Sequence, residues 1–144
     1  MHFPDFAEAE QTSGETMPTV AIEVRREYTA EQEIEIIDAV HAAMIECLKI
    51  PLGNLNTRLI AHKPHRFTAP GKTDRFTIVS IDLFQGRSLA TKRALYRAIV
   101  RNLGQLGIPA DHIKTVLREH KRENWGVRGG VPASDVDLGY EVHI

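Results

Sequence analysis

The sequence predicts a single α/β domain made of two tandem strand–helix–strand units, and three observations support this fold class. The chain has 144 residues, 42% of them hydrophobic, which is the usual size of one domain with its own core. An alternating strand, a capped helix, an Ile-Pro pair and a second strand occur twice, at a period of about 58 residues. Strands joined through a helix run parallel in a right-handed crossover, so the two copies predict a four-stranded sheet backed by two helices.

The first copy covers about residues 18–66. Apolar residues alternate over 20–24 as in a half-buried strand, and Thr29 with Gln32 forms a capping box that opens a helix. The helix ends before an Ile-Pro pair, and a second strand is expected over 56–62. The side chains predicted to face inward from the helix are Ile34, Ile37, Val40, Met44, Cys47 and Leu48.

The second copy covers about residues 75–134. A strand is expected over 76–84, a helix opened by Ser88 follows, and a further strand is expected over 113–117. The distance from helix cap to Ile-Pro is 21 residues in the first copy and 20 in the second, which indicates an internal duplication. The side chains predicted to face inward from this helix are Leu95, Ile99, Leu103 and Leu106.

The two segments outside the copies are expected to differ in structure, one as a flexible tail and the other as a strand. Residues 1–16 carry acids and small residues with little periodicity and are expected to be a flexible tail ahead of a domain over 17–144. Apolar residues alternate over 137–144 as in one more strand. One face of the sheet lacks a helix layer, and we expect it to be apolar and covered by other subunits.

Composition and motifs exclude several classes of function. With 18 Lys+Arg and 19 Asp+Glu there is no strong field for nucleic acid or an anionic membrane, and neither a membrane span nor a signal peptide is present, so we expect a cytoplasmic protein. The single cysteine, Cys47, is expected to be a core thiol. We expect no metal and no cofactor, since phosphate loops, nucleophile elbows and paired cysteines are absent.

Two short segments have weak chemical signals. His62 and His65 lie three residues apart, but Pro64 breaks any helix that would bring them to one metal, so a solvated basic loop is favoured and anion binding is the alternative. The glycine-rich segment 126–130 opens no helix and is more typical of a tight hairpin than of a dinucleotide loop.

Three further features stand out: Pro18 at the start of the first strand, Gly-Arg-Ser over 86–88 before the second helix, and the aromatic-glycine hairpin over 125–130. Together they resemble the tautomerase superfamily, which includes 4-oxalocrotonate tautomerase, malonate semialdehyde decarboxylase and cis-3-chloroacrylic acid dehalogenase. The resemblance covers about residues 18–134 and matches the fused, two-repeat form of the family.

The resemblance implies a homotrimer with an N-terminal proline as catalytic group and a small carboxylate as substrate. Pro18 would be the general base and acid, Arg87 would hold the substrate carboxylate in its bidentate fork, and Trp125 would wall the pocket. The first copy has Tyr28 where the second has Arg87, and the second has Thr77 where the first has Pro18, so one complete site is expected per chain. Further residues implied to line the site are Asn124, Arg128 and Lys114.

The sequence departs from the family pattern at three points. Gln85 replaces a second arginine of the decarboxylase and dehalogenase branches, and Asn54 replaces the acid of the decarboxylase. These departures favour keto–enol tautomerisation over decarboxylation, hydration or dehalogenation, which would need a water-activating acid such as Glu119 or Glu123. Residues also precede Pro18, and a peptide-bonded proline nitrogen is not basic, so either the mature chain begins at Pro18 or the protein is a non-catalytic member of the family.

Overall fold

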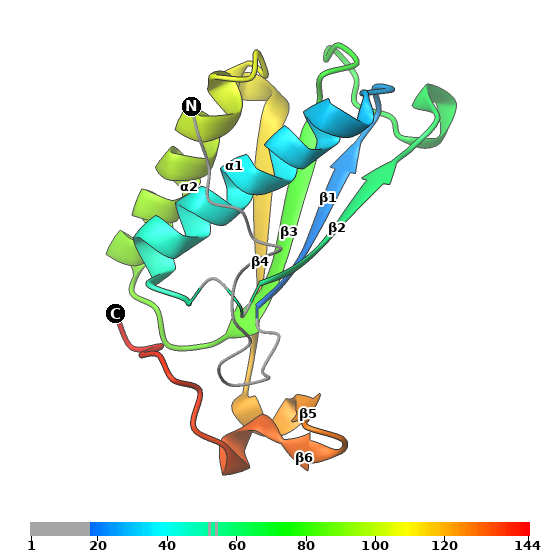
Figure 1. The fold of residues 1–144 in the computed structure, drawn as a ribbon. Coiled ribbons are helices and arrows are strands. Elements are labelled where there is room, and N and C mark those ends of the chain that lie inside the picture. Colours follow the sequence, from blue (N-terminus) through cyan, green and yellow to red (C-terminus); the bar gives the residue numbers. More distant parts are fainter. Residues whose placement is uncertain (1–17, 52, 54) are drawn as a thin grey trace.

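The computed structural model describes residues 18–51, 53 and 55–144, so the expected tail over 1–16, Met17 and Asn54 lie outside the described residues. The described part contains two long helices, a four-stranded sheet and a small hairpin (Figure 1). The elements are β1 (Thr19–Val24), α1 (Ala30–Leu48), β2 (Asn56–Ala61), β3 (Thr77–Phe84), α2 (Leu89–Gly104), β4 (Ile113–His120), β5 (Gly126–Val127) and β6 (Val131–Pro132).

Both helices begin at the caps that the sequence predicts. At α1 the capping box is complete: the Gln32 amide donates to Thr29 Oγ1 (3.1 Å), and the Thr29 amide donates to Gln32 Oε1 (2.9 Å). At α2 the Ser88 hydroxyl accepts from the Thr91 amide at 3.2 Å. The first helix ends at Lys49, which adopts a left-handed conformation with φ 56°.

The sheet has the strand order β2-β1-β3-β4, with β1 parallel to β2, β3 parallel to β4, and the two central strands antiparallel. Each repeat therefore supplies one parallel pair, and the repeats join through β1 and β3. In this register Thr19 pairs with Asp82 and Val24 pairs with Thr77. As a result, the start of the first strand in each repeat faces the strand-to-helix loop of the other repeat, at opposite ends of the sheet.

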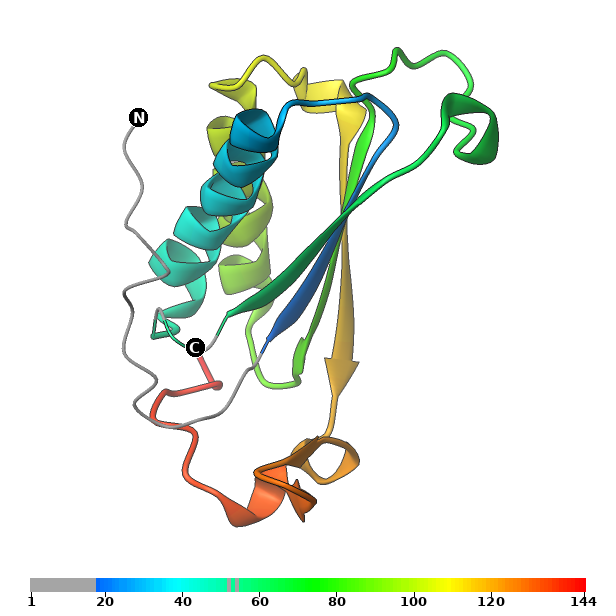
Figure 2. The same ribbon diagram turned by 45° about the vertical axis from the view of Figure 1, so that its right-hand side comes forward.

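The two helices lie side by side on one face of the sheet (Figures 1 and 2) and enclose the main core. The inward strand residues alternate as predicted: Val20, Ile22 and Val24 are fully or almost fully buried. Ile34 was expected to face inward but is 58% exposed, because the buried stripe of α1 begins two residues later, at Ile36, on another side of the helix. The single thiol, Cys47, is half-buried against the core, and burial raises its pKa.

The face of the sheet without helices is not the apolar surface that the sequence suggested. Since Val20, Ile22 and Val24 face the helices, the intervening residues face the other way. That face carries an ion pair between His62 and Glu23 (2.9 Å) and a cluster in which Asp82 accepts from both Arg118 (3.0 Å) and His120 (2.9 Å). Alternation gives the spacing of such a face but not its polarity, and here charged side chains share it with small ones and with the exposed apolar side chains of Ile60 and Val116.

The last residues of the chain form no strand, in contrast to the expectation for 137–144. They run as an irregular segment beside the β5–β6 hairpin and return toward the start of α2 (Figure 1). Leu138 and Val142 are buried with Phe84 and Ala133 in a second, smaller apolar cluster, so the alternating apolar residues serve a loop that packs on the end of the sheet. Among the described residues, no helix is long and apolar enough to cross a membrane.

Candidate active site

Pro18 lies at the end of the sheet where β1 begins and β3 ends. It is buried, and its carbonyl oxygen accepts from the Asn56 amide at 3.4 Å, which ties the start of β1 to the start of β2. Because Thr19 pairs with Asp82, the antiparallel register brings Pro18 to the same sheet end as the loop after Phe84. The two residues that the sequence singled out as catalytic, Pro18 and Arg87, therefore share one end of the molecule.

Arg87 is held between the end of β3 and the cap of α2. Gly86 before it has φ +139°, and a Cβ at Gly86 would lie 2.9 Å from the His143 imidazole, so this position of the loop requires glycine. Arg87 itself is only 5% exposed, and its Nη1 donates to the Phe84 carbonyl oxygen at 2.9 Å. That single bond engages one of the three guanidinium nitrogens.

The remaining guanidinium nitrogens of Arg87, Nε and Nη2, are buried and have no hydrogen-bond acceptor in the described part of the chain. The guanidinium carbon lies 5.8 Å from the centre of the Tyr140 ring, and the Tyr140 hydroxyl is also buried without a partner. Burial lowers the pKa of Arg87, while Tyr140, Glu119 and Glu141 oppose that shift. Buried polar groups are almost always paired in native proteins, so these unpaired donors are suited to a carboxylate ligand.

The C-terminal segment packs against the loop that holds Arg87. The Ile144 carbonyl oxygen accepts from the Ser88 amide (3.0 Å) and from Thr91 Oγ1 (2.7 Å). Arg122 anchors the start of this segment by donating to the Val136 carbonyl oxygen at 2.6 Å. The segment thereby covers the guanidinium of Arg87 with Tyr140, and it belongs to the walls of the candidate site.

Trp125 also lies at this end of the sheet. Its ring makes edge contacts with Phe84, at 5.7 Å between ring centres, and with His120, at 5.4 Å. Phe84 is buried and immediately precedes the loop of Arg87, so Trp125 lies one ring away from the arginine loop. This position agrees with the role of an aromatic wall.

The other sequence-derived candidates are more scattered. Asn124 ends a short 3₁₀ helix and is exposed, and Arg128 is exposed in the β5–β6 turn with φ 46°. Both lie in the hairpin segment that follows β4. Lys114 pairs with Ile78 near the start of β4, six residues before His120, which is about 20 Å along a strand. Within one chain, Lys114 is therefore at the opposite end from Pro18 and Arg87.

Comparison with known proteins agrees with this geometry. The model of a family described as tautomerase enzymes matches residues 55–128, more than half of the chain. The chain belongs to the tautomerase family. The matched range of this tautomerase-family chain includes Arg87 and Trp125 and begins after Pro18.

Solved structures of tautomerase-family proteins have the same architecture. The FG41 malonate semialdehyde decarboxylase inhibited by 3-bromopropiolate is 26% identical, with a TM-score of 0.68 over 75% of this chain and 87% of that one. A fused 4-OT symmetric trimer is 21% identical, with a TM-score of 0.73 over 81% and 96% of the two chains. Another malonate semialdehyde decarboxylase, described with decarboxylase and hydratase activities, is 19% identical, with a TM-score of 0.75 over 83% and 99%. The two similarities below 25% identity establish the fold alone.

Sequence reasoning missed the polar cluster beside Trp125. Asp82 accepts from Arg118 and His120, and the Arg118 hydrogen bonds lower the pKa of the Asp82 carboxyl most strongly. The cluster fixes His120 against Trp125. Its signal in the sequence is the spacing of Arg118 and His120, which places both side chains on one face of β4, but only the register with β3 shows that Asp82 is their partner.

Tyr140 was also missed as a contact of Arg87, because the segment that carries it was expected to form a strand. No group of three or more histidine, cysteine, aspartate or glutamate side chains within the described ranges is arranged to hold a metal ion. The site therefore consists of a proline, a buried arginine with free donors, and aromatic walls.

Proposed function

We propose that this chain is a keto–enol tautomerase, an isomerase that acts on a small 2-keto or unsaturated carboxylic acid. Pro18 serves as general base and acid, and Arg87 binds the substrate carboxylate. The observation that carries the proposal is the buried Arg87 guanidinium with two unpaired nitrogens, at the same end of the sheet as Pro18. Membership of the tautomerase family supports it.

The chemistry requires one basic nitrogen and one fixed cation. The Pro18 amine takes a proton from the carbon next to the substrate carbonyl, the C–H electron pair forms a C=C bond, and the carbonyl π pair moves to oxygen. The resulting ammonium returns the proton to the oxygen or to a distant carbon of the conjugated system. Apolar surroundings disfavour the charged ammonium and keep the amine basic near neutral pH, and the Arg87 charge stabilises the developing enolate.

This mechanism holds only for a chain that begins at Pro18, whose nitrogen is then a secondary amine. In a chain that retains residues 1–17, the same nitrogen belongs to a peptide bond and cannot take a proton. We therefore include in the proposal a mature N-terminus at Pro18, produced by translation from Met17 with removal of that methionine or by cleavage of the preceding segment. Without it, the chain would be a non-catalytic member of the family.

We further propose a homotrimer in the cytoplasm. Fused 4-OT trimers of the same architecture support the assembly, and the mixed outer face of the sheet, with its Asp82–Arg118 pair, offers charged as well as small residues to a neighbouring subunit. Sedimentation of the purified protein should give three times its chain mass, which is 16.2 kDa for all 144 residues, and a monomer would contradict this part of the proposal.

Decarboxylation of a 3-oxo acid is the second candidate, because an inhibited malonate semialdehyde decarboxylase is 26% identical to this chain. Against it, Gln85 is exposed and uncharged at the position beside Arg87. Of the two acids that could activate water, Glu119 is engaged with Lys92 at 2.7 Å and Glu123 is exposed on the short helix before Trp125. These features rank tautomerisation above decarboxylation, hydration and dehalogenation.

A panel of substrates tests the proposal with the chain that begins at Pro18. We expect turnover of phenylpyruvate or 2-hydroxymuconate and little turnover of malonate semialdehyde or 3-chloroacrylate. Pro18→Ala should lower kcat/KM by roughly 10²–10⁴-fold, the range of general acid–base catalysis. Pro70→Ala, at an exposed loop proline, is the matched control and should keep full activity. Decarboxylation exceeding tautomerisation would overturn the ranking, and an unaffected Pro18→Ala variant would overturn the mechanism.

A further inference from the structure

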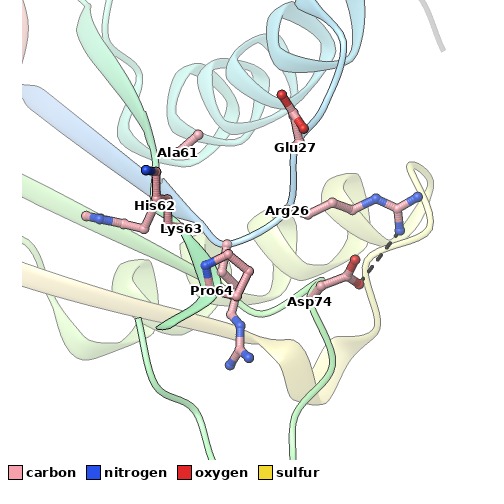
Figure 3. A pocket seen from close by; sticks show the side chains of 8 residues that line it. Arg26, Glu27, Ala61, His62, Lys63, Pro64 and Asp74 are labelled. Carbon is pink, nitrogen blue, oxygen red and sulfur yellow. Dashed lines mark ion pairs between the residues drawn. The ribbon is translucent and has the colours of Figure 1, made fainter. Parts of the chain in front are cut away.

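A cavity of about 430 Å³ lies at the end of the sheet opposite Pro18 and Arg87. It forms where β1 and β2 end and where the loop before β3 passes over them (Figure 3). The residues that line it are Arg25, Arg26, Glu27, Ala61, His62, Lys63, Pro64 and Asp74.

The charges around this cavity do not cancel. Arg26 pairs with Asp74 at 3.8 Å, and Figure 3 shows this contact as a dashed line. The Glu27 side chain points away from Pro64 and Asp74 in the same view. Arg25 and Lys63 have no ion pair with a carboxylate of the described chain, and the three cations of the lining, Arg25, Arg26 and Lys63, exceed its two acids, Glu27 and Asp74, by one charge.

Arg25 resembles Arg87 in its hydrogen bonding. Its Nε and Nη1 atoms are shielded from solvent and have no acceptor among the residues of the structure, as is the case for Nε and Nη2 of Arg87. A buried donor without an acceptor costs about 1–3 kcal/mol of folding free energy. An arginine that carries two such donors is therefore suited to bind an oxyanion.

The duplication gives the two ends of the sheet the same arrangement of strand and loop, although Arg25 is not the repeat equivalent of Arg87, whose position is taken by Tyr28. The antiparallel pairing of β1 and β3 places loop 25–28 of the first repeat beside the start of β3, just as it places loop 85–87 of the second repeat beside Pro18. At the far end, the position equivalent to Pro18 is occupied by Thr77, which is buried and donates its hydroxyl to the Arg75 carbonyl oxygen at 2.9 Å. This end has the cationic loop without a proline amine.

We propose that this cavity binds a small oxyanion, a carboxylate or a phosphate group, with Arg25 and Lys63 as its cationic partners and without turning it over. The site is separate from the Arg87 site by the length of the sheet. It does not depend on the proposed tautomerase activity, because it requires no basic nitrogen. A bound anion would neutralise Arg25 and supply the acceptor that its guanidinium lacks.

Two titrations followed by amide NMR test the proposal, one with inorganic phosphate and one with malonate, at constant ionic strength so that general screening is held fixed. We expect saturable shifts at residues 25–27 and 61–64, and the stronger of the two probes identifies the source class. Arg25→Gln should weaken binding at these residues by about tenfold or more. Arg97→Gln, an exposed arginine on α2, is the matched control and should leave binding unchanged, as should Arg87→Gln.

Three results would overturn the proposal. These are the absence of saturable shifts at residues 25–27, binding that survives Arg25→Gln, and binding abolished only by Arg87→Gln. Loss of the oligomer in Arg25→Gln, together with no anion binding in the parent, would assign Arg25 to a subunit contact instead. If Arg25→Gln does not fold, Lys63→Gln at an exposed position provides the same comparison, and an unchanged affinity in that variant contradicts the proposal.

Discussion

The two ends of the sheet follow one plan and carry different chemistry. At one end Pro18 faces a loop with the buried Arg87, aromatic walls and a covering C-terminal segment. At the other end Thr77 takes the position of the proline, Tyr28 takes the position of the arginine, and Arg25 and Lys63 line an open cavity. The duplication thus gives the two ends of the sheet the same arrangement of strand and loop. The residue that starts the strand differs, because Pro18 can supply a base whereas Thr77 cannot, and the Thr77 end has cations without a proline amine.

Replacing the arginine at each end of the sheet by glutamine should give the largest difference in kcat/KM between the two ends. Arg87→Gln removes a buried partner of the substrate carboxylate, which costs about 3–5 kcal/mol and lowers kcat/KM by roughly 10²–10³-fold. Arg25→Gln should leave kcat/KM within about twofold, because Arg25 lies at the far end of the sheet. Steady-state kinetics on the chain beginning at Pro18 measure both, and equal losses in the two variants would refute the assignment of one site to one end.

The helices of the two repeats should differ in how pH affects stability. His41 on α1 is buried and hydrogen-bonds Thr57 on β2, whereas the equivalent position of α2 carries Val100. Burial lowers the pKa of His41 from 6.5 to about 4. Between about pH 4 and pH 6.5 the His41 ring is protonated in the unfolded chain and neutral in the folded chain. The stability that is present above pH 6.5 is therefore lost as the pH falls through this range.

We expect the free energy of unfolding to fall by about 2 kcal/mol between pH 7 and pH 5 through this group. Urea titrations at the two pH values measure the loss. His41→Gln keeps a hydrogen-bonding side chain that does not titrate, and it should flatten the dependence. His143→Gln, at an exposed histidine, is the control. An identical pH dependence in the parent and in His41→Gln would show that another group is responsible.

The two helix caps offer the smallest contrast. Thr29→Ala and Ser88→Ala each remove one side-chain acceptor for a helix amide and should each cost about 1 kcal/mol in thermal or urea unfolding. Only Ser88 adjoins Arg87, and its hydroxyl bonds Thr91 Oγ1, which donates to the Ile144 carbonyl oxygen of the C-terminal segment, so only Ser88→Ala should also lower kcat/KM, by less than about tenfold. A reduced kcat/KM in Thr29→Ala would indicate that the ends of the sheet are coupled.

The features predictable from sequence are those fixed by neighbouring residues. The caps at Thr29 and Ser88 were predicted because a hydroxyl residue followed by a helical pattern specifies them locally. Pro18 and Arg87 were predicted as site residues from motifs at strand and helix starts, and the structure places both at one end of the sheet. The order β2-β1-β3-β4 required the structure, because only the pairing of β1 with β3 decides which loops meet.

The features missed depend on long-range register. Lys114 was predicted to line the site, and its pairing with Ile78 puts it, within one chain, at the other end of the sheet from Pro18. The contact of Tyr140 with Arg87 was not predicted. The alternating apolar residues around Tyr140 fit a strand, but they also fit the irregular segment observed, which buries Leu138 and Val142. Arg25 had no local signal, since its unpaired donors are visible only when the packed neighbours are known.

The most direct test of the account compares two chains that differ only in where they begin. Tautomerisation of phenylpyruvate should be measured for the chain that starts at Pro18 and for the chain that retains residues 1–17, with intact mass confirming each N-terminus. The account predicts that only the chain starting at Pro18 is active, because only its proline has a basic nitrogen. Equal activity of the two chains would contradict the assignment of Pro18 as the catalytic base.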